Sequence, residues 1–113
     1  MSNSSSSEGQ VTLYWRPGCG FCMGLERGLA EFDLDIARRN IWDDPSAAQF
    51  VRDNANGNET VPTVDIDGVV MVNPTARQML AAMQERTPHL LPADYEAPEQ
   101  GRVAKAVNRI LGG

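Results

Sequence analysis

The spacing of apolar and polar positions divides the first part of the chain into a strand and a helix. The β-branched and aromatic run Val11–Trp15 is typical of a buried strand, and Arg16-Pro17-Gly18 ends it. Apolar residues then recur at helical spacing, namely at Cys22, Leu25, Leu29 and Phe32. This spacing predicts a helix that begins near Cys19 and turns one apolar face inward.

The middle of the chain repeats this pattern of strand and helix. The segment Asp35–Trp42 predicts a second strand, although its alternation is imperfect. Asp44 followed by Pro45 predicts a helix start, because an aspartate cap precedes a proline whose missing N–H does no harm in the first helical position. The inner face of this helix would consist of Ala47, Ala48 and Val51. The polar segment Asn54–Glu59 is then expected to form a loop.

A hairpin and a third helix are expected next. The run Val61–Val72 predicts two strands joined tightly at Asp67-Gly68, a dipeptide that accepts the positive φ angles of a two-residue turn. Asn73-Pro74 repeats the cap-and-proline start and predicts a helix from there. The apolar face of this helix would consist of Ala76, Met79, Leu80 and Met83.

The carboxy-terminal part, residues 87–113, differs in pattern. Beyond Pro88 it is rich in proline and is expected to be irregular. A last helix is predicted over 102–111, with a basic stripe of Arg102, Lys105 and Arg109. Its apolar stripe would consist of Val103, Val107, Ile110 and Leu111. We therefore expect a flexible tail over 1–10, one domain over 11–86, and an extension over 87–113 that packs on or beside that domain.

The order of the elements indicates the fold class. A helix after each of the first two strands favours parallel pairing with right-handed crossovers, and the hairpin then adds an antiparallel strand at one edge. The prediction is an α/β fold, a mixed sheet of about four strands flanked by three helices. The carboxy-terminal extension would add a further helix.

Composition and charge narrow the classes of function. A chain of 113 residues is long enough for one compact domain. Its net charge of −5 argues against a nucleic-acid partner, because phosphate contacts need clustered Lys and Arg. No run is apolar enough to span a bilayer, and the serine-rich start has neither the positive charge nor the apolar core of a secretory signal. A cytoplasmic protein without a membrane partner is expected.

The candidate chemistry lies in the pair Cys19 and Cys22, the only cysteines of the chain. Cytoplasmic thiol pools keep such pairs reduced, which favours catalytic or metal-binding use. Cys19 would lie where unsatisfied N–H groups and the helix dipole favour a thiolate, and Arg16 could add positive potential. Cys22, one turn further on, would be more buried and resolve a mixed disulfide that Cys19 forms. Gly20 leaves room for a substrate sulfur.

Other interpretations of these residues stay open at this point. Zinc usually takes four ligands, and the chain offers one histidine, His89, so no metal site is predicted. An inert structural pair is the other alternative for the cysteines. At Val61-Pro62, a cis bond would let Val61 present its backbone to an extended ligand, but about 5–6% of X–Pro bonds are cis and a trans bond is commoner.

Three stretches together resemble the thioredoxin-fold redoxins, and among them the glutaredoxins. They are LYWRPGCGFC, then TVPTVDIDG, then a helix after NPT. The resemblance covers roughly residues 11–83 and implies a thioredoxin-like fold and a dithiol thiol-disulfide oxidoreductase without a tightly bound cofactor. It also implies that Pro62 is cis and packed against the cysteines, reversing the argument from frequency.

Finer detail is similar to the mycoredoxins, glutaredoxin-like proteins that use mycothiol. The stretches that carry it are DDPSAAQFVRDNANGNETVPTV and VNPTA. Members that use glutathione have a Gly-Gly and acidic residues before the last helix, whereas this chain has Val72-Asn73-Pro74-Thr75. The resemblance implies mycothiol as the cosubstrate. The substrate-binding residues that it indicates are Arg16, Gly20, Phe21, Thr60, Val61, Pro62, Asn73, Pro74 and Thr75.

Three functions remain in view. The first is a monomeric enzyme that reduces mycothiol mixed disulfides or protein disulfides, with S-thiolated or disulfide-containing proteins as partners. The second is a general disulfide redoxin that a thioredoxin-type reductase reduces. The third is a binding protein in which Cys19 of two subunits and two external thiols hold a [2Fe–2S] cluster, as in some glutaredoxins; Gly20, where many cluster-free members have proline, leaves this open.

Overall fold

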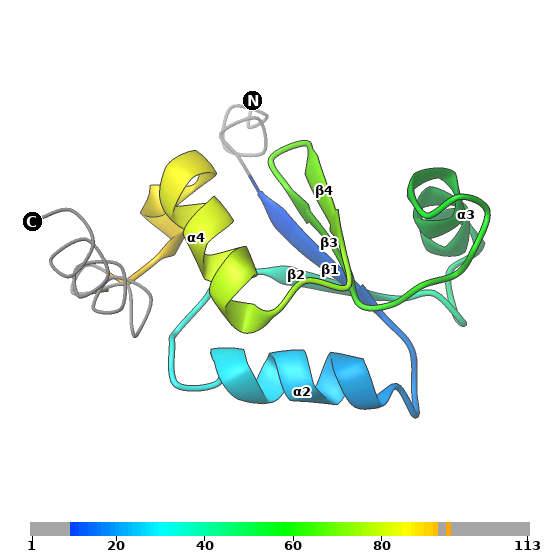
Figure 1. Cartoon of the computed structure of the whole chain (residues 1–113), viewed down its shortest axis with the longest axis horizontal. Coiled ribbons are helices and arrows are strands. Elements are labelled where there is room, and N and C mark those ends of the chain that lie inside the picture. Colours follow the sequence, from blue (N-terminus) through cyan, green and yellow to red (C-terminus); the bar gives the residue numbers. More distant parts are fainter. Residues whose placement is uncertain (1–9, 93–94, 96–113) are drawn as a thin grey trace, which may run out of the picture.

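A four-stranded mixed sheet forms the centre of the molecule (Figure 1). The computed structural model describes residues 10–92 and 95. The strands are β1 (Val11–Trp15), β2 (Ala37–Asn40), β3 (Thr63–Ile66) and β4 (Val69–Val72). They lie in the order β2-β1-β3-β4, with β1 parallel to β2 and the other pairs antiparallel. The expected α/β, thioredoxin-like arrangement with a hairpin at one edge is confirmed.

The second strand is shorter than the predicted segment Asp35–Trp42. Only Ala37–Asn40 pairs with β1, in a register that places Leu13 opposite Arg38. The apolar residues on either side of the strand, Ile36 and Ile41, are buried in the core instead of extending the exposed strand. The imperfect alternation of this segment therefore reflects a short polar edge strand between two anchoring isoleucines.

Three helices accompany the sheet, and their bounds are α2 (Gly20–Leu29), α3 (Pro45–Asn54) and α4 (Ala76–Arg86). The first two begin as predicted. Cys19 is the N-cap of α2, and the side chain of Asp44 caps α3 by accepting hydrogen bonds from the N–H groups of Ser46 and Ala47. Pro45 occupies the first turn of α3, where no N–H donor is needed.

The predicted start of α4 at Asn73 is wrong by two residues. Thr75 is the N-cap, and it forms a capping box in which its Oγ1 accepts from the N–H of Gln78 and its own N–H donates to Gln78 Oε1. Asn73 has a φ of 54° and donates its N–H to the carbonyl oxygen of Pro62 at 2.7 Å. Its backbone belongs to the turn beside Pro62, so it cannot open the helix.

The tight turn of the hairpin is confirmed. Asp67 and Gly68 have φ angles of 52° and 91°, the left-handed pair that a two-residue turn requires. The N–H of Gly68 donates to the side chain of Asp65 at 2.9 Å.

Helices cover both faces of the sheet, and each face has its own core. On one face α2 and α4 pack together against β1 and β3, through residues that include Leu13, Leu25 and Met79. On the other face α3 packs beside Tyr14 and Val61, and both cysteines belong to this second cluster. Figure 1 shows α3 well apart from α2 and α4. The cysteines therefore lie where the start of α2 meets the α3 side of the molecule.

The carboxy-terminal extension is described only in part. It begins with one 3-10 turn, Pro88–Leu90, where an irregular segment was predicted, because Leu90 and Leu91 pack against the core beside α4. Tyr95 packs against the same cluster. The predicted helix over 102–111 and most of the tail over 1–10 lie outside the described residues.

Candidate active site

The two cysteines lie at the amino end of α2 and form a disulfide bond. Their Cα atoms are 5.2 Å apart, because Cys19 caps the helix and Cys22 lies one turn further along it. Both side chains are almost completely buried, with exposed fractions of 4% and 3%. The expectation that Cys22 is buried holds, but Cys19 is buried to the same degree in this oxidised state because its sulfur packs in the α3-side core.

The start of the helix provides hydrogen-bond donors around Cys19. The N–H of Cys22 donates to Cys19 Sγ at 3.0 Å, and the N–H of Met23 donates to the carbonyl oxygen of Cys19 at 3.0 Å. Gly20 follows directly, and a Cβ atom there would have no neighbour within 4 Å. Phe21 is 72% exposed. The sulfur of Cys19 thus faces a helical N–H group beside an open stretch of backbone.

The loop before β3 lies against the same sulfur. The Val61–Pro62 peptide bond is cis, as the resemblance implies. Cys19 Sγ is 3.6 Å from the carbonyl oxygen of Val61. Asn73 joins the loop through its hydrogen bond to Pro62. The structure therefore brings Val61, Pro62 and Asn73 together beside Cys19.

The remaining predicted binding residues have structural contacts of their own. The carbonyl oxygen of Thr60 accepts a hydrogen bond from Thr63 Oγ1 at 2.8 Å. Pro74 is buried, and the side chain of Thr75 is engaged in capping α4. The contacts of these three residues are structural, and their role in binding a substrate stays a prediction.

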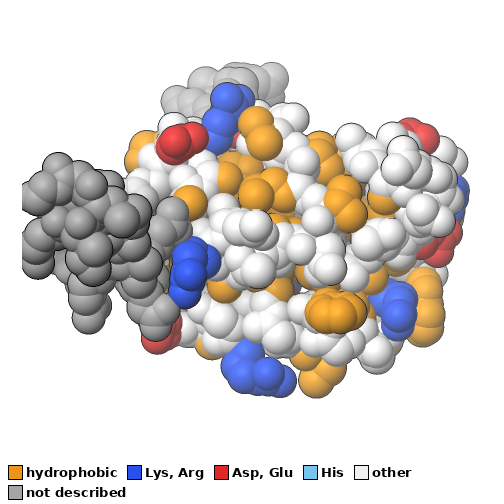
Figure 2. Space-filling model, viewed as in Figure 1, with side chains coloured by type: hydrophobic (Ala, Val, Ile, Leu, Met, Phe, Trp, Pro, Cys, Tyr) orange, Lys and Arg blue, Asp and Glu red, His pale blue; other side chains and the backbone are white. Residues whose placement is uncertain are grey.

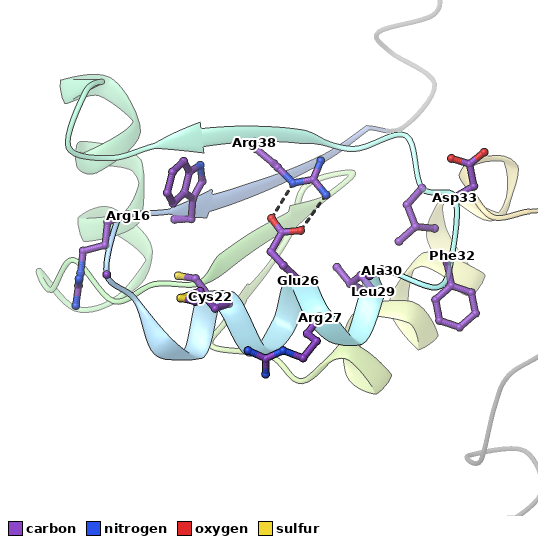
Figure 3. A pocket seen from close by; sticks show the side chains of 13 residues that line it. Arg16, Cys22, Glu26, Arg27, Leu29, Ala30, Phe32, Asp33 and Arg38 are labelled. Carbon is purple, nitrogen blue, oxygen red and sulfur yellow. Dashed lines mark hydrogen bonds and ion pairs between the residues drawn. The ribbon is translucent and has the colours of Figure 1, made fainter.

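Arg16 is turned toward an aromatic ring. Its Nη1 donates to the carbonyl oxygen of Pro17 at 2.9 Å, and its guanidinium carbon lies 5.5 Å from the ring centre of Trp42. In Figure 3 the side chain extends away from the sulfurs. Arg16 therefore contacts Trp42 and the loop, and the added positive potential at Cys19 stays a prediction.

A groove of about 770 Å³, which we call the α2–β2 groove, runs along α2 on the side of β2 (Figure 3). It extends from Gly18 and Cys22 at the start of the helix to the loop after the helix. Its apolar lining consists of Trp15, Met23, Leu29, Ala30, Phe32 and Leu34. The charged residues that line it are Arg16, Glu26, Arg27, Asp33 and Arg38.

One ion pair joins the two walls of this groove. Arg38 Nε donates to Glu26 Oε2 at 2.7 Å, and its Nη2 donates to Glu26 Oε1 at 3.0 Å. The hydrogen bonds that Arg38 donates to Glu26 raise the pKa of Arg38 above its usual value. This bidentate pair fixes the edge strand to α2.

The sequence prediction did not include the groove, although one signal of it was present. Met23 lies outside the apolar stripe of Cys22, Leu25 and Leu29, and it is 58% exposed. Figure 2 shows hydrophobic side chains at the surface near the amino end of α2. An exposed apolar residue beside a reactive cysteine favours contact with a partner or another part of the chain.

Neither a metal cluster nor a membrane-spanning helix is found in the described part of the chain. Residues 10–92 and 95 contain no group of three or more His, Cys, Asp or Glu side chains that could hold a metal ion. Over the same residues, no helix is long and apolar enough to cross a membrane.

The fold and the cysteine pair define a class of protein, and comparison with known proteins agrees. The family model of the glutaredoxins matches residues 11–71. The chain belongs to the glutaredoxin family, and it is a glutaredoxin-type thiol-disulfide oxidoreductase with a Cys-x-x-Cys active site.

The chain is also similar to individual members of known name. A protein of Mycobacterium tuberculosis that is named as a glutaredoxin is 34% identical over 74 residues, which cover 65% of this chain and 88% of the relative. Mycoredoxin 1 of Corynebacterium glutamicum is 32% identical over 75 residues, which cover 66% of this chain and 92% of the relative. The alignments thus leave about a third of this chain unmatched.

Proposed function

We propose that this chain reduces mycothiol mixed disulfides and protein disulfides, with Cys19 as the nucleophile and Cys22 as the resolving thiol. The observation that carries the assignment of roles is the hydrogen bond from the N–H of Cys22 to Cys19 Sγ. In the reduced protein the same N–H, at the positive end of α2, stabilises a thiolate on Cys19. Cys22 has the next turn of the helix around it and receives no such bond among the described contacts.

The reaction proceeds by two thiol-disulfide exchanges. The Cys19 thiolate attacks the mycothiol sulfur of a protein-mycothiol disulfide, whose S–S bond breaks as the protein thiolate leaves and takes up a proton. The Cys22 thiol then loses its proton and attacks Cys19 Sγ. Mycothiol leaves as a thiolate and is protonated, and the Cys19–Cys22 disulfide remains. Two external thiols, or a thioredoxin-type reductase, supply the two electrons that reduce this disulfide again.

The uncharged segment between β4 and α4 supports mycothiol as the cosubstrate. Glutathione carries carboxylates and an amino group, whereas mycothiol is a sugar-based thiol without the glutathione carboxylates. At Val72-Asn73-Pro74-Thr75 the chain has no charged side chain, the N–H of Asn73 is bonded to Pro62, and Thr75 caps α4. The similarity to a protein named mycoredoxin 1 supports the same choice.

We further propose domain boundaries and a cellular location for the enzyme. Residues 11–86 form the redox domain, and residues 87–113 form an extension to it. No tightly bound cofactor is needed for exchange between thiols, and the reducing cytoplasm is the compartment in which a reduced cysteine pair persists.

Mass spectrometry with two single-cysteine variants tests this function. A model peptide carrying a mycothiol or a glutathione mixed disulfide is mixed with Cys22→Ser or with Cys19→Ser, and the adduct on the protein is measured. We expect Cys22→Ser to take up mycothiol faster than glutathione, and Cys19→Ser to take up neither. Faster transfer to Cys19→Ser would reverse the roles of the cysteines. Equal rates with both adducts would contradict the preference for mycothiol.

The reductase-fed redoxin is the second candidate. Both cysteines are buried, and Cys22 is one of the residues that line the α2–β2 groove, so a protein partner bound in this groove would lie beside the disulfide. Rapid reduction of the Cys19–Cys22 disulfide by a thioredoxin-type reductase, with no increase in rate from added mycothiol, would establish this candidate in place of the first.

A further inference from the structure

The α2–β2 groove lies on a different side of the active site from the Val61–Pro62 loop. Its lining comes from β1, α2, β2 and the loop after α2, and it includes none of Val61, Pro62 or Asn73. The exchange reaction at Cys19 does not account for a groove that continues along α2 as far as Phe32. Apolar walls of this kind favour contact with a partner or with another segment of the chain.

The chain itself leads to the far end of this groove. Tyr95, the last described residue, packs its ring edge-on against Phe32, with ring centres 5.4 Å apart and planes at 63°. Phe32 lines the groove. Residues 96–113 therefore continue from a point beside the end of the groove, and the proline and glycine residues at Pro98 and Gly101 permit a turn.

The sequence of this remaining segment fits the groove in length. The apolar stripe of 102–111 spans ten residues, which measure about 15 Å as a helix, equal to the ten residues of α2. The residues between Tyr95 and Arg102 reach about 20 Å when extended. The segment can therefore lie alongside α2 without any change in the described fold.

The charge pattern of the segment agrees with this placement. At about 100° per residue, Arg102, Lys105 and Arg109 lie on the face of a helix opposite the apolar stripe. With the apolar stripe against the groove, the basic stripe would therefore face solvent.

From these observations we propose that residues 102–111 dock as a helix in the α2–β2 groove of their own chain. The apolar stripe covers Met23, Ala30 and Leu34, and the basic stripe faces solvent. The docked segment covers the approach to Cys22 along the groove and leaves the Val61–Pro62 side of Cys19 open. This inference goes beyond the proposed function and does not depend on the identity of the thiol.

Nuclear magnetic resonance of the oxidised full-length chain tests the contact. Val107→Asp places a charge within the apolar stripe, whereas Asn108→Asp adds the same charge one residue further on, outside the stripe. We expect Val107→Asp to shift the backbone amide signals of Leu29, Phe32 and Leu34, and Asn108→Asp to leave them in place. Unchanged signals from Val64 and Ile66 show that the sheet is intact in both variants.

Three results would overturn the proposal. Signals of the groove that do not respond to Val107→Asp mean that the segment lies elsewhere. Shifts centred on β4 or on α3 place the segment on another face of the domain. Shifts that grow with protein concentration in the unmodified chain mean that the segment binds the groove of a second copy.

Discussion

The close contact between α2 and α4 predicts opposite effects on stability for alanine substitutions at two glycines of α2. Gly24 and Gly28 both lie within α2, four residues apart. A Cβ atom at Gly28 would lie 2.8 Å from the Cβ of Ala76 in α4, whereas one at Gly24 would have no neighbour within 4 Å. Alanine in place of glycine within a helix stabilises by about 0.5–1 kcal/mol. Overpacking of a fixed contact costs about 1–3 kcal/mol.

The two substitutions should therefore differ in sign. Gly24→Ala is expected to raise the free energy of unfolding by about 0.5–1 kcal/mol, from helix propensity alone. Gly28→Ala gains the same stabilisation from helix propensity, but overpacking costs more than this gain, so the substitution should lower the free energy of unfolding by up to about 2.5 kcal/mol. Urea unfolding followed by circular dichroism measures both. The melting temperatures should differ in the same direction, by about 4–8 °C per kcal/mol in a small domain.

A second substitution identifies the contact responsible. Ala76→Gly removes the methyl group that the new side chain meets, so in the Gly28→Ala background it should restore stability. The coupling energy of this double-mutant cycle equals the overpacking term, about 1–3 kcal/mol. Equal stabilisation by Gly24→Ala and Gly28→Ala, or a coupling energy near zero, would refute the close approach of α2 and α4.

Three further predictions concern the turn and the helix caps. Thr75→Ala should lower the free energy of unfolding by about 1 kcal/mol, and Thr75→Ser should not, because only the hydroxyl is needed for the cap. Gly68→Ala should cost about 1–2 kcal/mol in the same urea assay, since its φ is 91°; a neutral result would contradict the turn geometry. Hydrogen bonds from Arg39 and Ser46 lower the pKa of Asp44 from 3.8 to about 2. The ionised carboxylate therefore stabilises the folded state above about pH 4, and this stabilisation is lost as the pH falls toward 2. Asp44→Asn should flatten the loss of stability over this range, and an unchanged acid profile would mean that Asp44 is not the group responsible.

Much of the fold could be predicted because local chemistry and tertiary structure agree. Asp44 and Pro45 start a helix for reasons contained in two residues, and Asp67-Gly68 forms a turn for the same kind of reason. Cys19 and Cys22 could be placed at a helix start because a strand, a break and an apolar stripe surround them.

The errors came where a distant residue decides the local structure. Asn73-Pro74 has the same form as Asp44-Pro45, yet the N–H of Asn73 bonds to Pro62 and the helix starts at Thr75. The Thr-x-x-Gln pattern of the capping box was present in the sequence and would have given the correct start.

Parts of the site also depend on contacts between distant segments. Arg16 lies over Trp42, which is far along the chain, so its direction could not be derived from its place beside Cys19. The α2–β2 groove depends on how the loop after α2 returns to β2, and no local pattern specifies that path. Family resemblance, rather than the residues alone, supplied the cis bond before Pro62.

The two outer strands of the sheet differ in a way that affects the behaviour of the protein at high concentration. β2 is short and carries the charged side chains of Arg38 and Arg39, which form ion pairs with Glu26 and Asp44. β4 consists of Val69–Val72, its two valine ends are exposed, and no strand among the described residues lies beyond it. A charged edge repels a strand from another molecule, whereas an apolar one accepts it. If the protein aggregates at high concentration, we expect this to begin at β4, and that edge is the place to add a lysine when a more soluble form is wanted.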